Sequence, residues 1–179
     1  MIKLDRIKIF ALGYDHKTDD YKLSAGVTDF QREDTVFQIY SLASNSWKLG
    51  PTVPYSISYT ARWHEVVVNG YHHWLAIAQR KFFILSFDII NESFKEMQPP
   101  KELLGKNLED DRIIPGVLEG CLYILDSSYT NGVKINVEVW EMLDYGVHES
   151  WTRRYIITHE SIIWRRNLIY SYVVVFWEW

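Results

Sequence analysis

Short hairpins, each with a tight polar turn between two apolar strands, recur along this chain of 179 residues. Residues 68–76, 118–125 and 164–170 are three such copies, spaced by about 50 residues. A second kind of hairpin covers residues 40–48, 87–95 and 140–152. In each copy a polar turn is followed by a return strand with an aromatic residue near its start. These repeats constrain the fold most, because a repeated unit can bury its apolar faces only against a neighbouring unit.

The repeat spacing is typical of propeller blades, and Val, Ile, Tyr, Phe, Trp and Thr gather in short runs bounded by turn residues. We therefore predict an all-β chain, a kelch-like β-propeller segment of about three and a half four-stranded blades that forms an incomplete ring. The expected boundaries are residues 7–49, 63–97 and 113–157 for the three blades and 161–177 for a partial fourth, within one domain of residues 1–179.

Two features locate turns and core within the blades. Asn69-Gly70 is the strongest two-residue hairpin signal in the chain. Trp47, Phe94 and Trp151 occupy equivalent positions of the second hairpin type, and this equivalence predicts that all three pack between blades. A propeller segment that is not closed leaves strand edges open, which favours self-association.

Composition excludes several classes of partner. The net charge is -4, and no basic run is longer than Arg153-Arg154 or Arg165-Arg166, so nucleic acid is not expected. No apolar run approaches the roughly 20 residues of a membrane-spanning helix, and the first residues do not resemble a signal peptide. The single cysteine, Cys121, is expected to be a buried and inert thiol in a reducing compartment. A cytoplasmic location follows, with the nucleus left open.

No catalytic or metal-binding motif stands out. His72 and His73 are adjacent in a predicted strand, so they point to opposite faces and cannot share one ion. Asp19-Asp20 and Asp110-Asp111 are pairs of neighbouring acids, which are more often solvated than catalytic. We therefore expect no catalytic residues, metal or cofactor. An enzyme stays the alternative class, and a convergent polar pocket would be its sign.

Several segments resemble the F-box-associated domain of plant F-box proteins. The segments that carry the resemblance are residues 10–15, 17–22, 39–42, 45–47, 69–76 and 84–88. Within that family, residues 139–142, 145–147, 149–152 and 160–161 look most like the S-locus F-box proteins of pollen. The resemblance covers most of the chain and fades after about residue 167, and the family's F-box has no counterpart in this sequence.

The resemblance implies a protein-binding function. Family members recruit substrates to Skp–cullin–F-box ubiquitin ligases, and S-locus members recognise non-self S-ribonucleases in self-incompatibility. Contact with the Skp-type adaptor and cullin is expected only through an F-box that this chain lacks. Two alternatives stay open: a general plant F-box-associated adaptor for another client, and a truncated binding protein that supports no ubiquitin transfer.

Acidic loops are the predicted client-binding residues, because a basic ribonuclease would be steered by complementary charge. Loops carry specificity on a rigid scaffold of sheets. The predicted residues are Asp29, Glu33, Asp34, Glu109, Asp110, Asp111, Asp144 and Tyr145.

Overall fold

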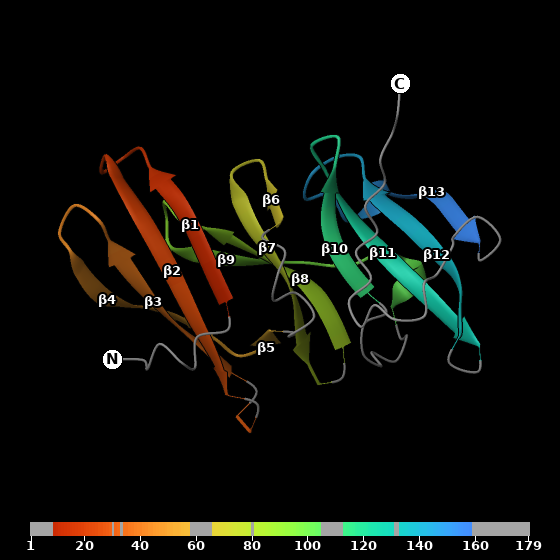
Figure 1. Cartoon of the computed structure of the whole chain (residues 1–179), viewed down its shortest axis with the longest axis horizontal. Coiled ribbons are helices and arrows are strands. Elements are labelled where there is room, and N and C mark those ends of the chain that lie inside the picture. The colour runs from red at the N-terminus through yellow and green to blue at the C-terminus, as the bar shows by residue number, and fades with distance from the viewer. Residues whose placement is uncertain are drawn as a thin grey trace.

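The structure is a computed structural model. It describes residues 9–29, 31–32, 34–57, 66–79, 81–104, 113–130 and 133–158. In these residues the chain forms three antiparallel sheets that follow one another in sequence and stand side by side (Figure 1). The all-β prediction and the incomplete propeller segment are confirmed. The predicted partial fourth blade, residues 161–177, lies outside the described residues.

The first sheet consists of four strands in the order of the sequence. These are β1 (Ile9–Asp15), β2 (Asp20–Asp29), β3 (Asp34–Ser41) and β4 (Ser46–Val53). Burial alternates along β3, where Phe37 and Ile39 are fully buried and their neighbours are half-exposed. This period of two places one face of the sheet in the core and the other toward solvent.

The second sheet is buried more completely than the first. It contains β5 (Ser56–Ile57), β6 (Val66–Val68), β7 (Tyr71–Ala78), β8 (Lys81–Asp88) and β9 (Ser93–Met97). β5 pairs with the end of β7, and β6 pairs with its start. Together these two short strands occupy the position that β1 has in the first sheet. β7 and β8 are buried almost throughout, as expected of strands that are covered on both faces.

The third sheet again has four strands in sequence order. These are β10 (Ile113–Leu118), β11 (Cys121–Thr130), β12 (Val133–Met142) and β13 (Trp151–Thr158). Two short 3₁₀ helices, η3 (Lys101–Leu103) and η4 (His148–Ser150), precede β10 and β13. The β6–β7 and β10–β11 turns each carry a residue and then a glycine at positive φ, at Asn69-Gly70 and Glu119-Gly120, which is the backbone of a type I′ hairpin.

Two apolar clusters join the sheets. The first cluster lies between the first and second sheets and contains Phe37, Ile39, Trp74, Leu85 and Phe87. A separate cluster lies between the second and third sheets, with Leu75 and Ile84 facing Ile124 and Trp140. Successive side chains of β7 and β8 therefore serve different clusters, and the second sheet holds the whole arrangement together.

The aromatic residues of the second hairpin type differ in burial. Trp151 is buried, and Phe94 packs against Phe37 with 4.7 Å between ring centroids. Trp47, by contrast, is 37% exposed. The prediction that all three pack between blades is wrong for Trp47, because this residue faces away from the second sheet and no described part of the chain covers it.

Phe37 makes the central contact between the first two sheets, so we expect Phe37→Ala to destabilise the protein strongly. Its ring is fully buried against aromatic rings of the second sheet, and the substitution should lower the free energy of unfolding by about 3–5 kcal/mol. Denaturation in urea measures the effect. Phe10→Ala, at a ring that is 53% exposed in the same sheet, is the control and should cost no more than about 0.5 kcal/mol. Equal effects would mean that Phe37 does not join the sheets.

Candidate functional site

The turns of the three sheets gather at two opposite edges. Because neighbouring strands are antiparallel, the turns alternate between two ends of each sheet. The β1–β2, β3–β4, β6–β7, β8–β9, β10–β11 and β12–β13 turns lie at one end, and the β2–β3, β7–β8 and β11–β12 turns lie at the other. We call these ends the upper and lower edges, as they are oriented in Figure 1. The connector from β4 to β5, residues 54–55, also lies at the lower edge, because the preceding Val53 pairs with Thr35 there.

The structure divides the predicted client-binding residues between the two edges. Asp29 and Asp34 flank the β2–β3 turn at the lower edge, whereas Asp144 and Tyr145 lie in the β12–β13 turn at the upper edge. Glu33, Glu109, Asp110 and Asp111 lie outside the described residues. The four placed residues therefore do not form one continuous surface.

The β2–β3 turn is organised by Asp29. Asp29 and Asp34 are direct partners across the strands, and Asp29 Oδ1 accepts hydrogen bonds from the backbone N–H groups of Gln31 (2.9 Å) and Arg32 (3.3 Å). The guanidinium Nε of Arg32 lies 3.7 Å from Asp29 Oδ2. Both side chains are largely exposed, so this ion pair contributes little stability and can exchange for a partner.

Tyr145 connects the third sheet to the second. Its hydroxyl lies 2.8 Å from His73 Nε2 and 3.3 Å from Ser86 Oγ, and its ring stacks on Tyr71 at 6.0 Å. His73 Nδ1 is 3.2 Å from the Val66 carbonyl, which can only accept, so Nδ1 carries the proton and Nε2 accepts from Tyr145. Tyr145 thus positions its turn on the second sheet, and its predicted contact with a client stays a prediction.

His73 is kept neutral by its surroundings. Its side chain is fully buried, and burial lowers the pKa of its imidazole to about 4 because the charged form loses its hydration. A neutral ring can accept a hydrogen bond from the Tyr145 hydroxyl at Nε2 while it donates one to the Val66 carbonyl from Nδ1.

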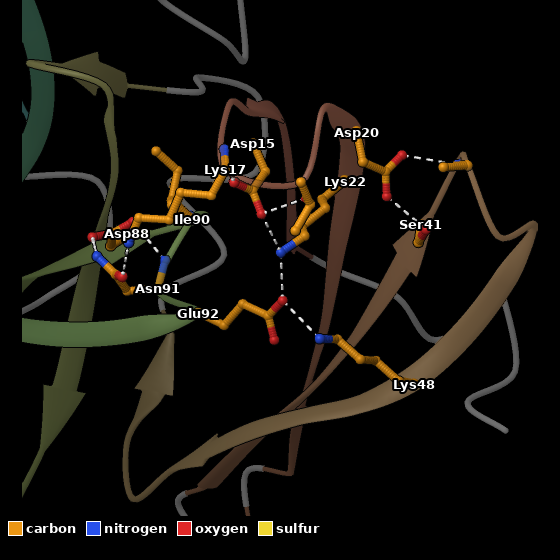
Figure 2. A network of polar contacts seen from close by, with 12 residues as sticks. Asp15, Lys17, Asp20, Lys22, Ser41, Lys48, Asp88, Ile90, Asn91 and Glu92 are labelled. Carbon is orange, nitrogen blue, oxygen red and sulfur yellow. Dashed lines mark hydrogen bonds and ion pairs between the residues drawn. The ribbon is translucent and has the colours of Figure 1, made fainter.

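A second polar contact between sheets lies at the same edge, where the β8–β9 turn meets the first sheet (Figure 2). The Lys22 ammonium is 2.7 Å from a carboxylate oxygen of both Asp15 and Glu92, and Lys48 is also 2.7 Å from Glu92. Lys22 and Asp15 are buried, with side chains 9% and 2% exposed. Glu92 therefore bridges two lysines of the first sheet from the second.

The charges in this network favour one another. The Lys22 hydrogen bond holds the pKa of Asp15 well below its usual range, with help from Thr18 and the Lys17 backbone. Burial alone would lower the pKa of Lys22, but its bonds to Asp15 and Glu92 outweigh burial and raise it. Burial likewise opposes ionisation of Glu92, yet Lys22 and Lys48 lower its pKa. All three groups are charged at neutral pH.

The turn that carries Glu92 is fixed by its own sequence. Asp88 accepts hydrogen bonds from the backbone N–H groups of Ile90 (2.9 Å) and Asn91 (3.0 Å), and Lys17 of the first sheet donates to Asn91 Oδ1 at 2.8 Å. Glu92 itself has a positive φ of 52°. Sequence reasoning missed this network, because residues that meet across sheets carry no spacing signal; only Asp88 followed by Asn91, a turn signal, was visible.

Two kinds of site are not found in the described part of the chain. No group of three or more His, Cys, Asp or Glu residues there is arranged to hold a metal ion. The described residues also contain no helix with the length and apolarity needed to span a membrane. The surfaces that remain as candidate sites are the turns at the upper and lower edges of the stacked sheets.

Comparison with known proteins identifies the family. Residues 3–172 match the F-box associated beta propeller domain. The chain is 30% identical over 190 residues to F-box protein CPR1 of Arabidopsis thaliana, a match that covers 90% of this chain and 44% of the relative. It is 27% identical over 146 residues to an F-box/kelch-repeat protein of the same plant, with 80% and 38% covered.

The chain belongs to the F-box associated beta propeller domain family. This family is a non-catalytic, substrate-binding module, so the prediction of a binding function is confirmed at the level of the family. The chain spans less than half the length of the curated relatives named above.

Glu92→Gln should weaken the contact between the first and second sheets. The substitution removes the charge that balances Lys22 and Lys48, and we expect a loss of about 1–2 kcal/mol in the free energy of unfolding, between the values for exposed and buried ion pairs. Thermal and urea unfolding provide the measurement. Glu102→Gln, at an exposed position of η3, should have almost no effect; a similar loss in both variants would contradict the bridging role.

His73 should make stability depend on pH. Its pKa is about 4 in the folded protein and near 6.5 when unfolded, so the unfolded chain binds the proton more readily. Its contribution is complete above pH 6.5 and is lost as the pH falls from 6.5 to about 4. Urea unfolding between pH 7 and 5 should show this slope, and His73→Phe should flatten it. The exposed His16→Asn is the control, and a slope that persists in His73→Phe would exclude His73 as its cause.

Proposed function

We propose that this chain is the client-recognition part of a Skp–cullin–F-box ubiquitin ligase. Membership of the F-box associated family carries the proposal, and relatives that match over most of the chain are named F-box proteins. The stacked sheets supply a rigid scaffold that presents unequal turns, which is the usual arrangement for selective binding.

Such a module needs no chemistry of its own. It holds a client beside the ubiquitin-transfer machinery and so raises the effective concentration of the client's lysines. The adaptor and cullin would join through an F-box, which this sequence does not contain.

The lower edge is the better candidate for client contact. Polar side chains of the upper edge are used between the sheets: Glu92 binds Lys22, and Tyr145 binds His73. At the lower edge the exposed Asp29 is bonded only within its own turn, to Gln31 and Arg32, among the contacts described. Side chains that do not hold the sheets together can vary from one client to another without loosening the contacts between sheets.

A basic protein is the client class that suits this edge. The chain has a net charge of -4, and acidic groups on a rim steer a basic partner and reject an acidic one. The resemblance to S-locus F-box proteins suggests a non-self S-ribonuclease of the pistil, recognised in pollen. A general plant F-box-associated adaptor with another client, or a binding protein without ubiquitin transfer, is the alternative.

A reconstituted reaction tests the proposal. The F-box segment of one of the Arabidopsis relatives is fused ahead of this chain, and a purified basic stylar ribonuclease is the probe. We expect ubiquitin transfer to the ribonuclease with the fusion and none with the chain alone. Binding of the ribonuclease without transfer would support a non-ubiquitinating binding protein. Failure of the ribonuclease to bind would remove it as the client.

Charge reversal locates the contact. Asp29→Lys combined with Asp34→Lys should weaken ribonuclease binding about tenfold at low salt, or ~1.4 kcal/mol, and should flatten its salt dependence. Biolayer interferometry at two salt concentrations measures both. Asp144→Lys combined with Glu149→Lys makes the same charge change at exposed positions of the upper edge and should have a smaller effect. The opposite ranking would assign the client to the upper edge.

A further inference from the structure

A chain of buried hydroxyl groups lies directly beneath the β2–β3 turn. Thr28 and Thr35 pair across the two strands, and the next pair, Asp29 and Asp34, ends the ladder. Both threonines are buried, Thr35 completely, and their Oγ1 atoms are 2.8 Å apart. Thr35 Oγ1 is also 2.8 Å from the carbonyl oxygen of Tyr55, in the connector between β4 and β5. The strand pair beneath the turn is therefore tied to this connector.

The hydrogen bonds in this chain have a fixed direction. A carbonyl oxygen can only accept, so Thr35 donates its single hydroxyl proton to Tyr55. Thr28 must then be the donor in the bond between the two threonines. Loss of the Thr35 hydroxyl would leave both the Thr28 donor and the Tyr55 acceptor unmatched, which is costly for buried groups. Loss of the Thr28 hydroxyl would leave the bond from Thr35 to Tyr55 in place, so Thr35 is the centre of the chain.

The connector is itself held against the second sheet. The Tyr55 ring packs edge-on against Phe83, with 4.6 Å between the ring centroids. The Tyr55 hydroxyl is hydrogen-bonded to the carboxylate of Glu96 in β9. This hydrogen bond raises the pKa of Tyr55 to about 12, so the hydroxyl keeps its proton and donates it at neutral pH. The Tyr55 carbonyl is thus a fixed point to which Thr35 ties the turn.

The contacts described above the threonines stay within the turn. Asp29 Oδ1 accepts from the backbone N–H groups of Gln31 and Arg32, and the Arg32 guanidinium faces Asp29 Oδ2. These contacts give the turn its shape but do not fix its place on the sheets. Besides the strand pairing, the hydroxyl chain is the described contact that fixes this place.

We propose that Thr35 is a positioning residue for client binding. Through the hydroxyl chain it holds the carboxylates of Asp29 and Asp34 in one arrangement before the client arrives, so less conformational freedom is lost on binding. This role rests on the proposed function, in which these two carboxylates contact a basic client. It adds a buried, uncharged residue to a site that charge alone does not reveal.

Amide hydrogen exchange, followed by NMR on the complete chain, tests whether Thr35 holds the turn. Thr35→Val keeps the shape of the side chain but removes the hydroxyl, and it should speed exchange of the Gln31 and Arg32 amides at least threefold. Thr35→Ser keeps the hydroxyl and should leave both rates near those of the wild type. The Ile90 and Asn91 amides, bonded in the same way to a carboxylate of the β8–β9 turn, are the internal reference and should not change. Unchanged rates for Gln31 and Arg32 in Thr35→Val would overturn the proposal.

Binding of the basic stylar ribonuclease, measured by biolayer interferometry, tests whether this position matters to a client. Thr35→Val should weaken binding about fivefold, chiefly through faster dissociation, and Thr35→Ser should bind like the wild type. Thr28→Val leaves the bond to Tyr55 in place and should have a smaller effect. Wild-type affinity in Thr35→Val would exclude a positioning role.

A variant in the other apolar cluster separates positioning from a general loss of stability. Ile124→Val removes a buried methyl group between the second and third sheets and should lower stability without changing the affinity for the ribonuclease. An equal loss of affinity in Ile124→Val and Thr35→Val would also overturn the proposal. A ribonuclease that does not bind the wild type would remove it as the client. In that case the exchange rates of Gln31 and Arg32 would still decide whether Thr35 holds the turn.

Discussion

The fold depends on the burial of the second sheet on both of its faces. Phe87 and Leu85 pack toward the first sheet, while Ile84 and Leu75 pack toward the third. A single unit of a repeat fold cannot bury its apolar face by itself. Each sheet therefore needs a neighbour, and loss of the middle sheet would expose both clusters at once.

Polar contacts at the upper edge specify how the sheets are stacked. Apolar faces can slide over one another at little cost, but Glu92 must meet Lys22, and Tyr145 must meet His73. An unmet partner would leave a buried charge or a buried ring nitrogen without a hydrogen bond, which is costly. The two contacts use different chemistry at corresponding places, so each turn fits its own neighbour better than the other one. At the lower edge, by contrast, the polar contacts described stay within or beside one sheet, as in the hydrogen bond from Thr35 Oγ1 to the Tyr55 carbonyl.

Much of the fold could be predicted from the sequence because hairpin signals are local. Asn69-Gly70 predicts its turn, and runs of β-branched and aromatic residues predict the strands, whereas which face of β3 is buried is known only from the structure. The equivalence of Trp47, Phe94 and Trp151 was also correct as a position in the repeat. Burial at that position was wrong for Trp47, since burial depends on a neighbouring sheet and not on the residue's own hairpin. The candidate site was less predictable: acidic residues could be found in the sequence, but their separation onto two edges could not.

The sequence by itself determined the class of the protein: its repeated hairpins and aromatic strands specify a stack of antiparallel sheets, and its match to the F-box associated family assigns this stack to a non-catalytic, substrate-binding module. Only the tertiary structure decided which side chains hold the sheets together and which are left for partners. Tyr145 illustrates the difference, because the sequence places it beside the exposed Asp144 and the fold turns its hydroxyl onto His73. The physical reason is distance along the chain: residues separated by 70 positions or more, such as Lys22 and Glu92, come together only after the hairpins have stacked.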